Sequence, residues 1–132
     1  MKTENVIQTK SFAFAIRVVS AYQFLTKQGN EYVLSKQLLR SGTSVGANVE
    51  EAIGGQSRRD FFAKMSIAYK EAREAVYWIR LLEATGYIPK IEAQSLMTDA
   101  EELCKIIGSI QISTKKSITK KSITNKSITN YE

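Results

Sequence analysis

A heptad pattern in the third quarter of the chain most constrains the fold, because it predicts a long helix packed at the centre of a bundle. Apolar residues recur there at alternating steps of four and three residues, the spacing of a helix that packs along one seam. The seam consists of Phe61, Met65, Ala68, Ala72, Ala75, Ile79 and Leu82. Ser57 and Asp60 resemble a capping box at its start, and Gly86 ends it.

A second helix with the same spacing follows directly. Pro89 suits the first turn of a helix, where its missing N–H costs nothing. The apolar seam of this helix is formed by Ala93, Leu96, Ala100, Leu103, Ile107 and Ile110. Cys104, the only cysteine, lies on the flank of the seam, and we interpret it as a small buried hydrophobe.

The first helix is predicted from about Ser11 to Lys27 and carries more apolar surface than a bundle needs. One stripe consists of Phe14, Val18, Ala21 and Leu25, and its neighbour of Phe12, Ala15, Val19 and Tyr22. Ile16 and Phe24 fall outside both stripes, so a monomeric bundle would leave them in water. This excess predicts a surface for a partner and therefore an oligomer.

The remaining helix is predicted to begin at Ser35 as N-cap and to end at Gly54 and Gly55. Its core positions are Leu38, Val45, Val49 and Ala52. Gly42 and Gly46 each cost about 1 kcal/mol in a helix relative to alanine, so we expect them to allow a close helix approach. A polar stripe runs beside the core positions and is either solvated or buried.

Part of that stripe faces two carboxylates in the heptad helix, and we expect a buried, hydrogen-bonded structural cluster between the two helices. Its members are Ser44, Asn48, Glu71, Glu74 and Trp78, with Arg40 within reach of a carboxylate. On this interpretation Asn48→Ala costs about 1–3 kcal/mol of stability. The alternative, a metal site or an acid/base pair, is disfavoured because the chain has no histidine.

Short connections between the helices predict an all-α, antiparallel up-down-up-down four-helix bundle. We expect an N-terminal extension at residues 1–10, the bundle at 11–114 and a tail at 115–132. The first ten residues lack a secretory pattern and no apolar stretch reaches membrane-spanning length, so we expect a cytoplasmic protein without a membrane partner. No motif indicates a cofactor, a metal or an enzyme.

The net charge of +6 is concentrated in the tail. Residues 115–132 carry five lysines against one acidic residue, and they repeat Lys-Ser-Ile-Thr with a period of five. Since that period fits neither helix nor strand, we expect the tail to be disordered. Its lysines are either a solvated end or a phosphate-binding segment: Lys115, Lys116, Lys120, Lys121 and Lys126.

Two motifs resemble the bacterial four-helix-bundle family called 23S rRNA intervening-sequence proteins. They are Arg-Ser-x-x-Ser-x-x-x-Asn at residues 40–48 and Glu-x-x-Glu-x-x-x-Trp at residues 71–78. The resemblance covers roughly residues 8–112 and leaves the tail outside. Related accessory proteins of diversity-generating retroelements form barrel-shaped homopentamers that bind nucleic acid, so the resemblance implies a ring-like homopentamer.

We therefore expect a non-enzymatic scaffold that binds RNA or DNA through basic side chains. Besides the tail lysines, the candidates are Arg40, Arg58, Arg59 and Lys64. Such contacts would be directed at phosphates and would weaken steeply with salt. The alternative is a scaffold that recruits a protein partner, such as a mobile-element protein, which the charge of only +2 outside the tail favours.

Overall fold

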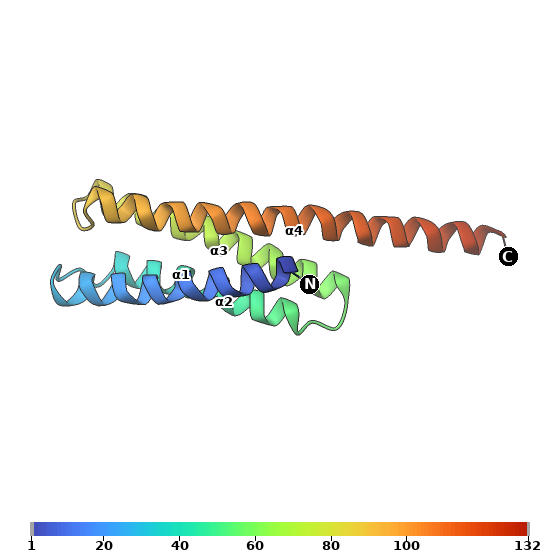
Figure 1. Cartoon of the computed structure of the whole chain (residues 1–132), viewed down its shortest axis with the longest axis horizontal. Helices are drawn as coiled ribbons and strands as arrows, with labels where there is room; N and C mark the ends of the chain where they lie inside the picture. The colour runs from blue at the N-terminus through green and yellow to red at the C-terminus, as the bar shows by residue number, and fades with distance from the viewer. Residues whose placement is uncertain (1, 132) are drawn as a thin grey trace.

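Four antiparallel helices form a bundle in the computed structural model, which describes the backbone of residues 2–131 and the side chains of residues 6–123. The helices are α1 (Lys2–Lys27), α2 (Leu34–Ile53), α3 (Arg58–Ala84) and α4 (Lys90–Tyr131), and no strand occurs in the described range. Short loops join them alternately up and down (Figure 1). α1 and α3 each pack against α2 and α4 but not against each other, so they occupy opposite corners. The predicted four-helix bundle is confirmed.

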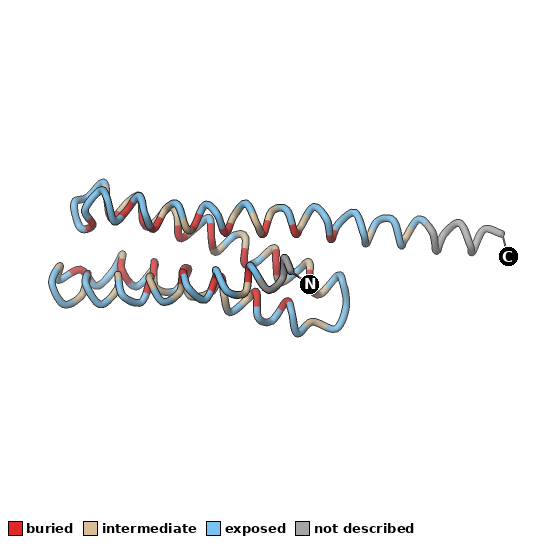
Figure 2. Tube along the Cα trace, viewed as in Figure 1, coloured by how far each residue is buried: buried red, intermediate tan, exposed pale blue. Residues whose placement is uncertain are grey.

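The predicted seams of α2, α3 and α4 form the core. Every seam residue of these three helices is buried, with exposed fractions from 0 to 7%. Figure 2 shows the buried positions recurring along the sides of the helices that face one another. The spacing of apolar residues was therefore sufficient to identify the inner face of each of these helices.

α1 follows the prediction on one stripe and departs from it on the other. Phe14, Val18 and Leu25 are fully buried, as expected. Phe12 and Val19, which we placed on an apolar arc continuous with the core, are 68% and 40% exposed. The prediction was wrong for these two because α2 and α4 cover only one side of α1.

Both ends of the chain are more ordered than the sequence suggested. α1 begins at Lys2, so the expected N-terminal extension belongs to the bundle: Ile7 is fully buried, and Gln8 donates hydrogen bonds to the Glu50 carboxylate at 2.9 and 3.1 Å. At the other end α4 continues as helix through Tyr131 in place of the expected disorder. Extending a helix that the bundle has already nucleated is much easier than starting one, which explains the difference.

The start of α2 is fixed by an acidic residue of the preceding loop and not by Ser35. The Glu31 carboxylate accepts hydrogen bonds from the backbone N–H groups of Val33, Leu34 and Ser35, at 2.7–3.1 Å. The Ser35 hydroxyl instead donates to the Glu31 carbonyl at 2.9 Å. Glu31 therefore satisfies the free donors of the first turn, and the prediction of Ser35 as N-cap was wrong.

The other helix ends agree with the sequence. The Ser57 hydroxyl accepts the N–H of Asp60 at 3.0 Å, which confirms the cap of α3. Gly86 adopts a φ of 84° just after α3, a conformation that favours glycine. The Pro89 carbonyl accepts from Ala93 in the first turn of α4. Within the described residues, no helix has the length and apolarity that crossing a bilayer requires.

Candidate nucleic-acid interface

Packing of α3 on α4 brings basic residues from two distant parts of the sequence to one end of the bundle. Gln111 of α4 donates a hydrogen bond to the Ser66 hydroxyl of α3 at 3.1 Å, which fixes the register of the two helices. Because they run antiparallel with equal rise per residue, Arg58 and Arg59 lie level with about residues 118 and 119. We call this region the basic end; it comprises Arg58, Arg59, Lys115, Lys116, Lys120 and Lys121.

The side chains of the basic end are exposed and largely without an acidic partner. All six are exposed to solvent. Arg58 stacks over the Phe61 ring, 5.2 Å from its centroid, so its position is fixed without neutralising its charge. Among the described residues Arg59, Lys115 and Lys116 make no ion pair, and neither does Lys121. The charges of Arg59, Lys115, Lys116 and Lys121 are therefore available to an anionic ligand.

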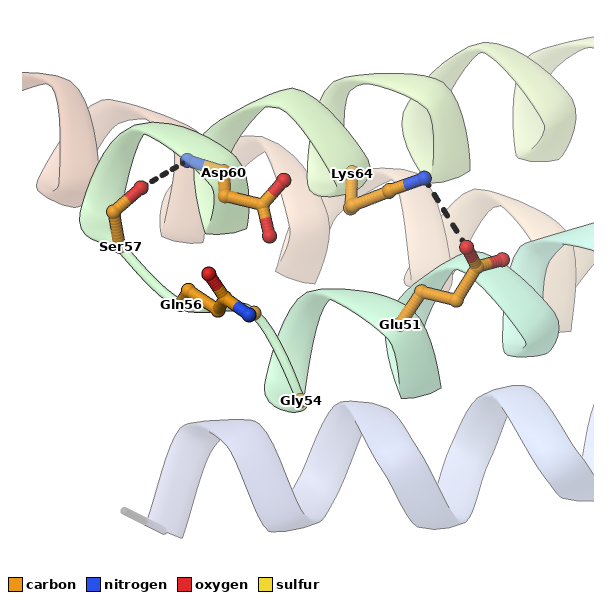
Figure 3. Close-up of a pocket in the computed structure, with 7 residues that line it drawn as sticks. Glu51, Gly54, Gln56, Ser57, Asp60 and Lys64 are labelled. Atoms are coloured by element: carbon orange, nitrogen blue, oxygen red, sulfur yellow. Dashed lines mark hydrogen bonds and ion pairs between the residues drawn. The ribbon is translucent and has the colours of Figure 1, made fainter.

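The loop between α2 and α3 forms a polar pocket of about 600 Å³ beside the basic end (Figure 3). It contains Lys64, whose Nζ lies 3.1 Å from the Glu51 carboxylate, and the Asp60 side chain also lines it. Two carboxylates against one ammonium make the pocket unsuitable for phosphate. The structure therefore separates Lys64 from the other basic candidates.

Arg40 also lies apart from the basic end. It is exposed on α2, one helix away from the Glu71 carboxylate, whose pKa is raised by desolvation and by Glu74, and the charge of Arg40 only opposes that rise. Lys126 lies outside the described side chains. Of the nine basic candidates, the structure thus brings six together.

The expected cluster between α2 and α3 forms only in part. The Trp78 indole N–H donates to the Glu74 carboxylate at 3.1 Å, but both residues belong to α3. Asn48 donates at 2.8 Å to the Ser44 carbonyl in its own helix. Among the described residues, no hydrogen bond joins these α2 side chains to Glu71 or Glu74. The cluster is half-buried, so the prediction of a buried network linking the two helices was wrong.

Comparison with known proteins places this bundle in a family. The model of the 23S rRNA-intervening sequence proteins matches residues 3–109. The chain belongs to this family. It is also similar to the crystal structure of a protein of unknown function from the S23 ribosomal protein family of Bacteroides thetaiotaomicron VPI-5482. The two share 48% sequence identity with a TM-score of 0.82, over 83% of this chain and 97% of that one. No curated protein matches the chain.

The half-buried face between α2 and α3 lies within residues 3–109, the part of this 23S rRNA-intervening sequence protein that the family model matches. Desolvation raises the pKa of Glu71, the nearby Glu74 carboxylate raises it further, and Arg40 opposes the shift. A carboxylate that is partly shielded without hydrogen-bond donors is unfavourable in its charged form. In a single copy of this protein, the charged form of Glu71 on this face therefore destabilises the folded state.

Sequence reasoning missed two features of this 23S rRNA-intervening sequence protein. The first is the shared height of Arg58, Arg59 and the α4 lysines, which depends on the α3–α4 register and on the helical state of residues 115–121. The second is the exposure of Phe12 and Val19 on α1. If the tail had been predicted as helix, the shared height of the basic residues could have been derived from the sequence. The excess of apolar residues on α1 is the signal that could have indicated the exposure of Phe12 and Val19.

Proposed function

We propose that this protein is a non-enzymatic, cytoplasmic scaffold that binds RNA or DNA through the basic end, as a homo-oligomer. The observation that supports this most is that the exposed Arg58 and Arg59 lie level with exposed lysines of α4 at one end of the bundle. Of the two carboxylates in the adjacent pocket, Glu51 is paired with Lys64, which leaves Asp60 as the pocket's acidic group against the six basic side chains. Exposed clusters of this kind bind phosphate backbones with little sequence preference.

The distribution of isoleucines on the α4 extension favours nucleic acid over an anionic membrane. A helix that lies on a bilayer needs one continuous apolar face. At 100° per residue, Ile112 and Ile123 point in about the same direction but lie about three turns apart, Ile118 points about 120° away from them, and Lys116 lies within about 40° of the direction of the first two. The extension therefore has no side to insert among lipids, while its charges surround most of the helix.

A protein-recruiting scaffold remains the second candidate, and the exposed apolar side of α1 favours it. Such a scaffold would use an apolar, charge-poor surface to hold a mobile-element protein or another partner. The family resemblance predicts five subunits in either case. The two functions differ in whether the basic end contributes to binding.

Binding of fluorescent 20-nucleotide single- and double-stranded RNA and DNA across a salt series tests the proposal. Arg58→Glu with Arg59→Glu should weaken binding by about tenfold or more at low salt, because two phosphate contacts become repulsive. The matched control is Lys36→Glu with Lys90→Glu, which makes the same charge change at exposed positions toward the other end of the bundle.

Removal of residues 115–132 should also reduce both the affinity and the slope of log Kd against log salt. Equal weakening in the control variant would show that only net charge matters and would contradict a defined site. Unchanged affinity in the Arg58/Arg59 variant, or no binding by the wild type, would favour the protein-recruiting scaffold.

A further inference from the structure

One side of α3, next to α4, combines basic and aromatic side chains and contains no carboxylate. At 100° per residue, these side chains share a sector of about 100° that runs the length of the helix. We call five of them the α3 row: Tyr69, Lys70, Arg73, Tyr77 and Arg80. The same sector also contains Arg59 of the basic end, together with Phe62, Ser66 and Ala84. The sector therefore has four positive charges and no negative one.

The composition of the α3 row differs from that of an ordinary solvated helix face. Such a face usually alternates positive and negative side chains, which pair about one turn apart. The three cations of the row are exposed, and among the described residues none of them forms an ion pair. Two carboxylates border the sector, Glu83 on α3 and Glu101 on α4, and they leave the row with a net positive charge. The row therefore suits an anionic ligand.

Arg73 and Tyr69 form a stacked pair within the row. The Arg73 guanidinium lies 6.0 Å from the centroid of the Tyr69 ring and donates a hydrogen bond to the Tyr69 hydroxyl at 3.5 Å. Gly108 of α4 lies beside the ring, since a Cβ added there would be 3.8 Å from it. The ring is half-buried, whereas the guanidinium is exposed. A guanidinium held in this way offers a charge to a phosphate and a flat surface to a base.

Tyr77 is the more exposed of the two tyrosines in the row, with 55% of its surface in water. Its ring is held by an edge-to-face contact with Trp78, at 5.0 Å between centroids and 77° between planes. Beside the ring lies a pocket of about 510 Å³, whose lining also includes Arg80, Leu81, Glu83, Ala84 and Met97. Sites for small molecules have volumes of about 300–1,000 Å³. The ring and the pocket can therefore receive a flat, largely apolar group such as a nucleobase.

The α3 row continues the basic end along the bundle. The row itself is about 17 Å long, and the distance along the helix from Arg59 to Arg80 is about 32 Å. Stacked nucleotides of one strand are about 3.4 Å apart, so the row has the length of about five nucleotides, and the row with Arg59 that of about nine. A strand bound at the basic end can therefore extend along the row.

We propose that the α3 row binds single-stranded RNA or DNA, with phosphates on its cations and unpaired bases on Tyr77 and on the stacked Arg73–Tyr69 pair. Bases can stack on protein rings only when they are not enclosed in a duplex. Duplex phosphates need the cations alone, which leaves the exposed tyrosine without a role. Because every base has a flat face, binding should show little sequence preference. This inference rests on the proposed nucleic-acid function and adds the form of nucleic acid that is bound.

Tyr77→Leu tests the stacking, with Tyr77→Phe as the matched control. Leucine keeps an apolar side chain without a ring, and the exposure of residue 77 makes it a position that tolerates substitution. For a fluorescent single strand of about 10 nucleotides, Tyr77→Leu should weaken binding about tenfold, whereas Tyr77→Phe should bind as the wild type does. A duplex of the same sequence should bind all three proteins equally. Unchanged single-strand affinity in Tyr77→Leu, or an equal loss of affinity for the duplex, would overturn the proposal.

Trp78 provides a second measurement at the same place, because it is the only tryptophan of the chain and contacts Tyr77. Saturating single strand should quench its fluorescence, and saturating duplex should not. Poly-L-glutamate that binds as tightly as the single strand would show that the row recognises charge alone and would overturn the proposal.

The variant with Arg58→Glu and Arg59→Glu separates this inference from the proposed function. If that variant keeps its single-strand affinity while Tyr77→Leu loses it, the row is supported and the basic end is not the site. If that variant loses affinity for single strand and duplex alike while Tyr77→Leu binds normally, the basic end is supported and the row is refuted. No binding of any nucleic acid by the wild type would refute both.

Discussion

The two sides of α2 are built in contrasting ways. Toward α1 the helix is closed: a Cβ added at Gly42 would lie 2.7 Å from a methyl group of Val18. At the outer edge of its contact with α3, the most extensive helix contact in the bundle, it presents Arg40, Ser44 and Asn48, which are exposed or half-buried and make their side-chain hydrogen bonds within α2 itself or not at all. The closed side holds the bundle together by steric fit, while the open side leaves polar groups accessible to another molecule.

Gly42→Ala should have the largest effect on stability, because the added methyl group does not fit between α2 and α1. Val18 is fully buried and β-branched, so it cannot move aside. We expect a net loss of about 1–3 kcal/mol in the free energy of unfolding, despite the gain of about 1 kcal/mol in helix propensity. Chemical denaturation of the variant and the wild type measures this change in the free energy of unfolding.

Gly46→Ala is the matched control for Gly42→Ala. A Cβ at Gly46 would lie 3.5 Å from Ser11, an ordinary contact, so this variant should gain up to about 1 kcal/mol. Equal effects of the two substitutions would show that the α1-facing side is not closed at Gly42.

Glu31→Ala should have the next largest effect, because the closed side depends on where α2 begins. Burial raises the pKa of Glu31, but the N–H groups of Ser35, Leu34 and Val33 outweigh burial and lower it. A lowered pKa in the folded state means that the stabilisation is present above the ordinary glutamate pKa and is lost as pH falls through the folded-state value. We expect a loss of about 1–2 kcal/mol at neutral pH that disappears in acid. Thermal melts of the wild type and the Glu31→Ala variant from pH 7 to pH 3 would show this loss of the stability difference in acid. A stability difference that does not change with pH would contradict the role of the Glu31 carboxylate.

The contrast also explains which features the sequence could predict. The seam from Phe61 to Leu82 follows from spacing alone, because each seam residue meets the core whatever the neighbouring helix contributes. The Glu31 cap could not be predicted, since its carboxylate precedes the helix by three residues and its role depends on the loop conformation. The hydrogen-bond partner of Asn48 could not be predicted either. An asparagine indicates that some polar partner exists, but only the geometry shows that the partner is the Ser44 carbonyl.

Asn48→Ala should have a smaller effect than a buried link between helices would give. The side chain is half-buried and bonds the carbonyl one turn earlier, a group that already accepts within the helix. We therefore expect a loss below about 1 kcal/mol in the free energy of unfolding, measured by chemical denaturation. Ser66→Ala offers a comparison on α3, since Ser66 is also half-buried and accepts a hydrogen bond from a different helix. A cost of about 2 kcal/mol or more for Asn48→Ala, the full penalty of an orphaned buried group, would show that the α3-facing side of α2 is tightly packed.

Glu71→Gln should have the smallest effect and the opposite sign. Desolvation and the neighbouring Glu74 raise the pKa of Glu71, so its charged form is disfavoured in the folded state. A raised pKa means that the group's contribution is fully present below the unfolded-state pKa and is lost as pH rises through the folded-state value. Glutamine keeps the shape without the charge, so the variant should equal the wild type in acid and be slightly more stable at neutral pH. Glu101→Gln, which removes an exposed carboxylate on α4, is the control. Stability curves against pH that coincide for Glu71→Gln and wild type would show that the open side carries no electrostatic cost, and the contrast between the two sides of α2 would then be one of packing alone.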